Sequence, residues 1–328
     1  MKRNWQIFLG IPLSIFLLYL VFGRLDYREL METLKRANYL LLLFSLSLLL
    51  FHMVIRALRW EILLRPVKRM RFSSLLGTLF IGFMANNFLP ARMGDVARGY
   101  LLGKLESFPK ASSFATLIAE KFLDGFTILS TFAILSLALR NLNTSQGFYR
   151  TLAFGGYFSL GLFTITLVVF LLIRYSPDTF MRIFKPSGWS NEAKGHLYSF
   201  REGLGWFDRW DCLLPSVGLS YLIWITYALG IHITSMAFSL KVPFIASFLA
   251  MVAVCIVTTL PFTPGYIGTY HAALSYSLIL YGVPMEKAAA VALVFHALFF
   301  LPTTLLGILF LWHYHLSLSS LRQEVKGN

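Results

Sequence analysis

The stretch Asn86–Tyr100 reads NNFLPARMGDVARGY, and it decides how the rest of the chain is interpreted. It ends an apolar run, 72–90, that is long enough for a membrane helix. Two asparagines and a proline close this run, and charged residues follow at once. Proline removes a backbone donor and clashes with the preceding turn, so a helix breaks there. A plain spanning helix needs none of these features, and the stretch therefore predicts a broken, polar element inside a membrane domain.

The composition of the whole chain is that of a polytopic membrane protein. Of its 328 residues, 57% are hydrophobic and 13% are charged, and the mean hydropathy is +0.68. Soluble domains are about half apolar and about a quarter charged. We therefore expect one all-α integral membrane domain, 1–328, with about six spanning helices and two re-entrant broken-helix hairpins. The apolar blocks lie at about 5–23, 39–58, 72–90, 113–139, 151–173, 213–239, 244–260, 266–281 and 288–312.

The charges and cysteines exclude several other classes of protein. The formal net charge is +14, but the basic residues lie between apolar blocks, which indicates membrane topology and anionic lipid rather than nucleic acid. The two cysteines, Cys212 and Cys255, lie in no CxxC motif and predict no redox or zinc site. The amino-terminal apolar block has no small-x-small cleavage motif, so we expect an uncleaved first helix.

The two apolar blocks that contain breaks resemble each other. LPARMG at 89–94 and LPFTPG at 260–265 share Leu-Pro followed by Gly at the same distance. FPKASSFATLIAEK at 108–121 aligns with VPMEKAAAVALVFH at 283–296. These matches predict an internal repeat of helix, broken hairpin and helix. Repeat 1 covers about 39–139 and repeat 2 about 213–312.

The placement of Lys and Arg predicts the orientation of these repeats. The stretch 56–71 holds six basic residues against one acid and is expected to be cytoplasmic. If 72–105 enters and leaves at that face, the loop 174–212, with six more basic residues, is cytoplasmic too. The two repeats are then inverted, and their hairpins reach the middle of the membrane from opposite faces, as in many transporters. Both termini are expected in the cytoplasm.

Arg92, Asp95 and Arg98 are candidates for a lipid-phosphate site. They are three residues apart and therefore neighbours on a helix. Arginine donates paired hydrogen bonds to phosphate oxygens, and Asp95 can orient the two arginines. An interfacial turn whose arginines reach water is the alternative. The polar pair Asn86 and Asn87 inside an apolar block favours the phosphate site.

The second break reads TPGYIGTY at 263–270. Its prolines and glycines free backbone amides, which can bind a phosphate or sugar together with the hydroxyl groups. The alternative is a tight turn that packs against its repeat partner. The residues expected to line a cavity here are Thr263, Gly265, Thr269 and Tyr270, and His271 and His296 are candidates to join them.

Glu120, Lys121 and Asp124 lie near the start of an apolar stretch, where charges are costly and face partners or cavities. They either bind a headgroup cation or carry protons, or they form a structural ion pair.

Arg56 and Arg59 share a helix face with His52, just before Trp60. They are either an anchor at the membrane interface or the cytoplasmic mouth of a lipid path.

Several motifs are absent. The sequence contains no HExxH, P-loop, GxSxG or Rossmann fingerprint, so nothing predicts an ATP-driven pump. Histidine spacing gives no metal site, and no cofactor is expected. No carboxylate pair lies on the predicted outer loops, where a lipid-linked glycosyltransferase would need one.

Four motifs together carry a family resemblance: RALRW (56–60), NNFLPARMGDVARGYLL (86–102), EKFLD (120–124) and LPFTPGYIGTYHAAL (260–274). With them, the sequence resembles the lysylphosphatidylglycerol synthase transmembrane (flippase-like) family over nearly its whole length. This resemblance implies movement of lipids between leaflets, notably of aminoacylated phosphatidylglycerol, and in related members a link to polyprenyl-phosphate or glycolipid pathways. The chain ends at Asn328 without a soluble acyltransferase-like domain, so we expect a stand-alone member and no aminoacyl transfer.

We therefore expect a non-enzymatic lipid translocase of the bacterial inner membrane that moves an anionic phospholipid, lipid-linked or polyprenyl-phosphate headgroup through a polar cavity. Its expected partners are that lipid, further copies of the chain and a lipid-modifying enzyme, but not nucleic acid. One alternative is a membrane transferase or phosphatase that uses Asp95 or Glu120 on a lipid carrier. Another is a non-transporting scaffold for envelope assembly, which predicts a dry, apolar interior at both breaks.

Overall fold

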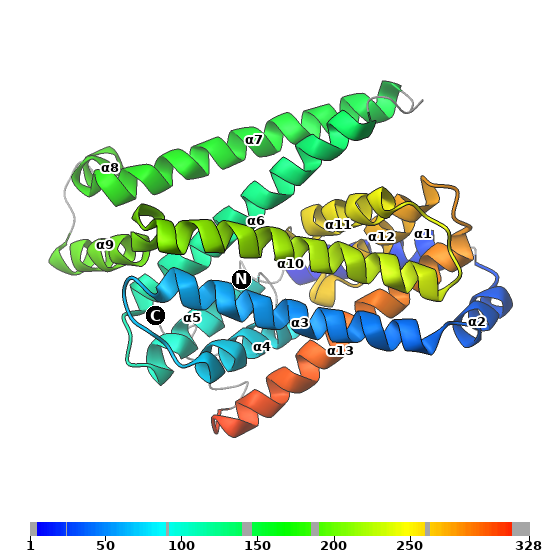
Figure 1. The fold of residues 1–328 in the computed structure, drawn as a ribbon, viewed down its shortest axis with the longest axis horizontal. Coiled ribbons are helices and arrows are strands. Elements are labelled where there is room, and N and C mark those ends of the chain that lie inside the picture. The colour runs from blue at the N-terminus through cyan, green and yellow to red at the C-terminus, as the bar shows by residue number, and fades with distance from the viewer. Residues whose placement is uncertain are drawn as a thin grey trace. The chain divides into compact units, whose positions relative to one another are not determined.

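The computed structural model describes residues 5–23, 25–89, 92–139, 146–184, 190–259 and 263–316. These residues form helices joined by turns and contain no β-strand (Figure 1). The predicted all-α polytopic membrane fold is thereby confirmed. The helices are α1 (Trp5–Phe22), α2 (Tyr27–Lys35), α3 (Tyr39–Leu64), α4 (Phe72–Phe88), α5 (Met93–Leu105), α6 (Lys110–Leu139), α7 (Gln146–Tyr175), α8 (Pro177–Phe184), α9 (Asn191–Gly203), η2 (Gly205–Asp208), α10 (Trp210–Ala237), α11 (Phe244–Thr259), η3 (Pro264–Tyr266), α12 (Thr269–Ile279) and α13 (Met285–His313).

Three of the described helices, α3, α10 and α13, are long and apolar enough to cross a membrane. At about 1.5 Å per residue, their 26 to 29 residues exceed the roughly 30 Å of the hydrocarbon core. A fourth span is added if the second half of α7 and α8, which are bent by 120°, count as one. The predicted number of about six spans is not confirmed and stays a prediction.

The two predicted repeats contain the same order of long and short helices. The helices α3 to α6 have 26, 17, 13 and 30 residues. The helices α10 to α13 have 28, 16, 11 and 29 residues. The four short helices are about 16 to 26 Å long, less than the roughly 30 Å hydrocarbon core. Their lengths agree with half-membrane hairpins, whose re-entrant path stays a prediction. The prolines at 90 and 261, like both chain ends, lie outside the described residues.

The chain divides into two compact units, which are described separately. Unit 1 comprises Met1–Val54, Leu76–Arg98 and Ile223–Asn328, and unit 2 comprises Ile55–Leu75 and Gly99–Leu222. The boundaries fall inside helices rather than in loops. A single membrane domain with two repeats stays a prediction.

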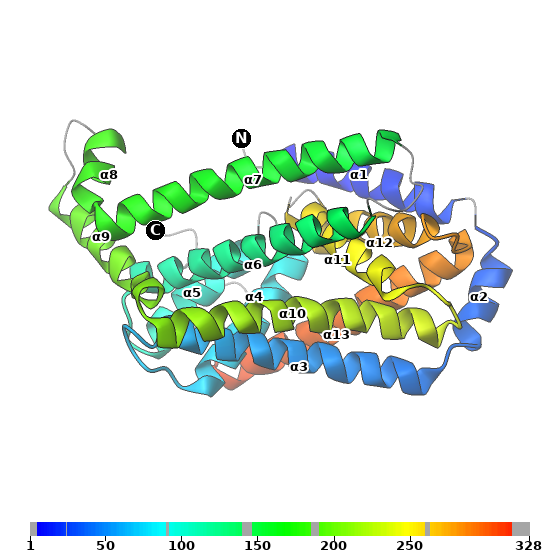
Figure 2. The same cartoon turned by 45° about the horizontal axis from the view of Figure 1, so that its top comes forward.

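In unit 1, the first helices of the two repeats lie side by side and run antiparallel (Figures 1 and 2). The Ser45 hydroxyl lies 2.9 Å from the Thr234 hydroxyl, and Nδ1 of His52 lies 2.9 Å from the carbonyl oxygen of Ile223. Residue numbers therefore fall along α10 as they rise along α3. This opposite direction is the one that inverted repeats require of their first helices.

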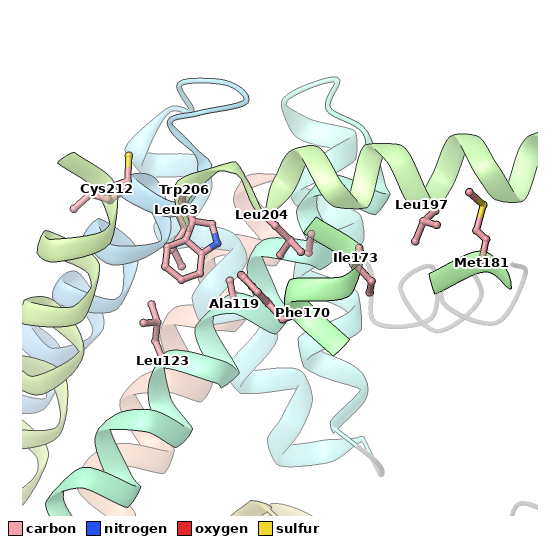
Figure 3. Packing of buried hydrophobic residues seen from close by; sticks show 12 residues of the cluster. Leu63, Ala119, Leu123, Phe170, Ile173, Met181, Leu197, Leu204, Trp206 and Cys212 are labelled. Atoms are coloured by element: carbon pink, nitrogen blue, oxygen red, sulfur yellow. The ribbon is translucent and has the colours of Figure 1, made fainter. Parts of the chain in front are cut away.

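Unit 2 has its own hydrophobic core, in which α6, α7, α9 and η2 meet (Figure 3). The indole of Trp206 is completely buried and lies edge-on to the ring of Phe170, with 5.9 Å between centroids. Large buried aromatic rings dominate the packing energy of such a core. The buried residues of this core are Ile62, Leu63, Ala115, Ala119, Leu123, Phe170, Ile173, Met181, Leu197, Leu204, Trp206 and Cys212.

Candidate functional site

The segments that precede and follow the two predicted breaks meet in unit 1. Arg92, at the first break, donates from Nη2 to the carbonyl oxygen of Thr258 at 2.9 Å. Gly265, at the second break, lies so close to Asn87 that an added Cβ would stand 3.2 Å from its carbonyl oxygen. We call the residues at this junction the break cluster: Asn86, Asn87, Arg92, Asp95, Arg98, Thr258, Gly265 and Tyr266.

The carboxyl end of α11 attracts the guanidinium of Arg92. The last carbonyls of a helix have no partner within the helix, and the helix dipole favours a cation beside them. Thr258 is the penultimate residue of α11, so the guanidinium satisfies one such carbonyl. Arg92 has a φ of 53°, and Tyr266, which hydrogen-bonds with the Arg92 side chain, has a φ of 58°. Non-glycine residues in this left-handed region are strained, and such strain concentrates at functional sites.

Asn86 joins the two halves of the first hairpin. Its Oδ1 accepts the Gly94 N–H at 2.9 Å and so satisfies a free amide in the first turn of α5. Its Nδ2 donates to Oδ1 of Asp95 at 3.3 Å. The backbones of α4 and α5 touch here, because a Cβ on Gly94 would lie 1.9 Å from the carbonyl oxygen of Gly82. The asparagine therefore fixes the position of α5 and of its charges.

Asp95 and Arg98 lie together, as their spacing predicts. Nε of Arg98 lies 3.9 Å from Oδ1 of Asp95, and Arg98 is 2% exposed. An arginine so deeply buried is costly unless anionic or hydrogen-bonding groups surround it. The break cluster thus holds two arginines, Arg92 and Arg98, and one carboxylate.

The other predicted residues of the second break form a local network. The hydroxyls of Thr263 and Thr269 lie 2.9 Å apart, and that of Thr269 also donates to the carbonyl of Tyr266 at 3.1 Å. Asn87 extends toward α13, where its Nδ2 donates to the Thr304 hydroxyl at 2.8 Å. The first two bonds lie within the turn itself, and whether the turn lines a cavity or packs against its repeat partner stays a prediction.

A row of buried rings, which we call the ring cluster, lies beside the second break in unit 1. It consists of His271, His296, Tyr270, Tyr227 and His52. The His271 and His296 centroids are 4.9 Å apart, and the His296 ring is stacked on that of Tyr270 at 4.5 Å. The Tyr270 hydroxyl lies 2.7 Å from that of Tyr227. The two predicted histidines are therefore brought together, next to a predicted tyrosine.

Unit 2 contains a buried ion cluster. Nη1 of Arg59 lies 2.7 Å from Asp124 and 2.8 Å from the Ser220 hydroxyl, and Arg56 lies 3.5 Å from Asp124. Arg59 has no exposed surface, and its Nε and Nη2 have no hydrogen-bond partner among the described residues. The structural ion pair, one of the alternatives for Asp124, is thus present.

The other two charges predicted beside Asp124 face different surroundings. Glu120 is 2% exposed, whereas Lys121, the next residue, is exposed. Successive residues of a helix point about 100° apart, so this difference follows from their positions in α6.

Some residues of these clusters were not predicted from the sequence. Tyr266 lies within the quoted second motif and so had a signal, whereas the Thr258 carbonyl had none, because every residue carries a backbone carbonyl. Ser220 and Tyr227 had none, because serine and tyrosine are ordinary residues in an apolar helix. Their roles depend on contacts between helices far apart in the sequence.

The comparisons with known proteins agree with this architecture. The family model described as the lysylphosphatidylglycerol synthase TM region matches residues 7–307. A UPF0104 membrane protein of Methanocaldococcus jannaschii is 23% identical over 222 residues, which cover 68% of this chain and 90% of that protein. A second from the same organism is 25% identical over 252 residues, 72% of this chain and 73% of that protein. A UPF0104 membrane protein of Methanothermobacter thermautotrophicus is 22% identical over 255 residues, 71% of this chain and 73% of that protein.

Proposed function

The chain belongs to the lysylphosphatidylglycerol synthase transmembrane-region family, and from this premise we propose that it is a lipid translocase of the bacterial inner membrane. Its cargo is an anionic phospholipid, lipid-linked or polyprenyl-phosphate headgroup. The headgroup passes the junction of the two broken hairpins while the acyl or prenyl tail stays in the lipid. Membership of a multi-pass membrane family supports the setting, and the break cluster supports the chemistry.

The observation that carries the proposal is the contact between Arg92 and the Thr258 carbonyl. It places an arginine from the first break on the end of a helix from the second. A neutral carbonyl is a weaker partner than a phosphate, because the phosphate carries negative charge and offers two oxygens to the paired donors of the arginine. A lipid phosphate that reaches Arg92 can therefore displace Thr258 and loosen one link between the hairpins.

Arg98 supplies the second cation, and Asn86 and Asp95 hold both halves of the first hairpin in place. Loss of one charge-assisted bond costs about 1.5–3 kcal/mol, which is roughly a 10- to 150-fold loss of affinity. A non-transporting scaffold predicts an apolar interior at both breaks. The break cluster is polar, and this difference favours transport.

Reconstitution into vesicles tests the proposal. The probes are fluorescent phosphatidylglycerol and a labelled polyprenyl phosphate, with the inner-leaflet fraction measured by a membrane-impermeant quencher. Arg92→Ala is expected to slow the transport of at least one probe by tenfold or more, and Arg92→Lys by less, because lysine keeps the charge but loses the paired donors.

Arg36→Ala is the matched control, because Arg36 also lies in unit 1 but its side chain is 82% exposed. Arg36→Ala should transport at the wild-type rate. A wild-type rate in Arg92→Ala as well would contradict a phosphate site at Arg92. Chemical conversion of the labelled lipid, followed by mass spectrometry, would instead support the transferase or phosphatase.

A further inference from the structure

A pocket of about 470 Å³ lies within unit 2 and takes no part in the function proposed above. Pockets that bind small molecules typically measure about 300–1,000 Å³. The walls of this one come from the loop after α3, the end of α7, the end of α9 with η2, and the residue before α10. Pro66, Val67 and Gly205 form its uncharged part.

Four charged side chains, two of each sign, form the rest of the lining. Two of them, Arg174 and Asp208, already bind each other. Arg174 donates to Asp208 from Nε at 2.8 Å and also from Nη2, and its Nη1 donates to the Arg201 carbonyl at 3.1 Å. Asp208 in turn accepts the Tyr175 hydroxyl at 2.6 Å. Because all three nitrogens of Arg174 have partners, this pair is a fixed part of the wall.

The other two charged side chains can take a further partner. Nε and Nη2 of Arg209 lie 3.1 and 2.7 Å from the carboxylate of Asp211, which leaves Nη1 without a partner among the described residues. The Glu202 carboxylate has neither a hydrogen bond nor an ion pair within the described part of the chain. Since the pair of Arg209 and Asp211 is exposed, it is weak, and the guanidinium can also serve another anion.

These two open groups, Arg209 and Glu202, have opposite charges. The charges of the whole lining cancel, so the pocket suits a neutral ligand whose positive and negative groups are separated. A guanidinium matches phosphate oxygens, and a carboxylate accepts the N–H groups of a primary ammonium. Quaternary ammonium groups are instead held in aromatic cages, and no aromatic side chain is among the described residues that line the pocket.

The place of the pocket in the fold indicates a lipid headgroup. Pro66 follows two residues after the end of α3, and Arg209 directly precedes α10, and both helices are long and apolar enough to cross a membrane. Tyr175 and Trp210, beside the pocket residues Arg174 and Arg209, are 57% and 71% exposed. Exposed Tyr and Trp at the ends of spans are typical of the membrane–water interface. The pocket therefore lies at headgroup level, at the face that is predicted to be cytoplasmic.

We propose that this pocket binds phosphoethanolamine, the zwitterionic headgroup of a membrane lipid, with its phosphate on Arg209 and its ammonium on Glu202. Binding is non-covalent and needs no transport, so this site does not depend on the proposed function. A bound headgroup joins the loop after α3 to the segment before α10 and thereby stabilises the folded chain. Free phosphoethanolamine offers the same chemistry, and the experiment separates the two sources.

Native mass spectrometry of the full chain in detergent tests the lipid. The protein is mixed with equal amounts of phosphatidylethanolamine, phosphatidylcholine and phosphatidylglycerol that carry the same acyl chains. Isothermal titration calorimetry with phosphoethanolamine tests the soluble source. The variants are Glu202→Gln and Arg209→Gln, which change exposed side chains and should leave the fold intact. Glu192→Gln is the matched control, because Glu192 also lies on α9, is 87% exposed and does not line the pocket.

We expect phosphatidylethanolamine to bind about fivefold or more tightly than phosphatidylcholine, because only the primary ammonium donates hydrogen bonds to the carboxylate. Each pocket variant should lose about fivefold or more of this affinity, and Glu192→Gln should keep it. Binding of free phosphoethanolamine that depends on Glu202, without a preference among the lipids, would support the site and assign it to a soluble ligand. A preference for phosphatidylglycerol, or unchanged binding of both probes in the two pocket variants, would overturn the inference.

Discussion

Replacing Gly94 with alanine tests whether the two halves of the first hairpin must touch. The added Cβ would lie 1.9 Å from the Gly82 carbonyl oxygen and 2.7 Å from the backbone nitrogen of Asn86. An ordinary contact needs 3.4 Å or more, so α5 must move away from α4 by about 1.5 Å. Both contacts are with backbone atoms, which cannot turn aside as a flexible side chain can.

The cost has two parts. Overpacking of this kind costs about 1–3 kcal/mol, and loss of the Gly94 N–H bond to Asn86 adds about 0.5–1.5 kcal/mol. We therefore expect Gly94→Ala to lower the free energy of unfolding by about 2–4 kcal/mol. Because the same shift displaces Arg92 from Thr258, transport should fall as well.

Gly218→Ala is the matched control, because no atom lies within 4 Å of its added Cβ. Alanine is the better helix former, so this variant should be stabilised by up to about 1 kcal/mol. Thermal unfolding in detergent, followed by the loss of monodisperse protein in size-exclusion chromatography, measures both. The close approach of α4 and α5 would be refuted if Gly94→Ala unfolded at the same temperature as Gly218→Ala.

Three further predictions concern charges and hydroxyls. Asp124→Asn should destabilise unit 2 by about 3–5 kcal/mol, because it leaves Arg59 buried without its anion. Asp211→Asn, which removes one partner of an exposed ion pair, should cost less than about 1 kcal/mol. Equal losses of the two variants in thermal unfolding would contradict this. Burial acts to raise the pKa of Glu106, but hydrogen bonds from Ser74 and Arg71 and the charges of Arg71 and Lys68 hold it below 4.5. The stabilising contribution of the Glu106 carboxylate is therefore present above pH 4.5 and lost as the pH falls further. The stability of the wild type should drop more steeply below about pH 4.5 than that of Glu106→Gln. Parallel curves of stability against pH would count against the ion pair of Glu106 with Arg71. Tyr270→Phe leaves the buried Tyr227 hydroxyl without this partner and should cost about 1–3 kcal/mol. An unchanged unfolding temperature would count against this hydrogen bond.

The helices were predictable from the sequence because their signals are local. Apolar blocks and the prolines of LPARMG and LPFTPG predict long helices and breaks without any knowledge of neighbours. The spacing of Asp95 and Arg98 likewise predicts that they lie together on one helix. The boundaries were less accurate: α3 continues to Leu64, beyond the apolar block that ends at 58, because Arg59 and Trp60 find buried partners.

Contacts between distant segments could not be predicted. The sequence does not indicate that Arg92 reaches Thr258, 166 positions away, or that Arg59 binds Asp124 rather than facing a lipid path. Each depends on which helices become neighbours. The sequence indicates His271 and His296 only as two separate candidates. Their contact arises from the packing of α12 on α13, which no local pattern predicts.

The partners of the arginines favour one of the two predicted arginine sites as the place where a lipid phosphate binds and leaves. Arg59 lies on a buried carboxylate, and separating such a pair costs about 3–5 kcal/mol, so a phosphate would have to displace Asp124 and leave it buried without a counter-charge. Arg92 lies on a backbone carbonyl, and a hydrogen bond of this charge-assisted kind is worth about 1.5–3 kcal/mol, less than the cost of separating the Arg59 pair. A transported ligand must bind tightly enough to enter and weakly enough to leave, and an easily exchanged partner meets both needs. Arg92 is therefore suited to capture and release, and Arg59 to holding α3, α6 and α10 together within unit 2.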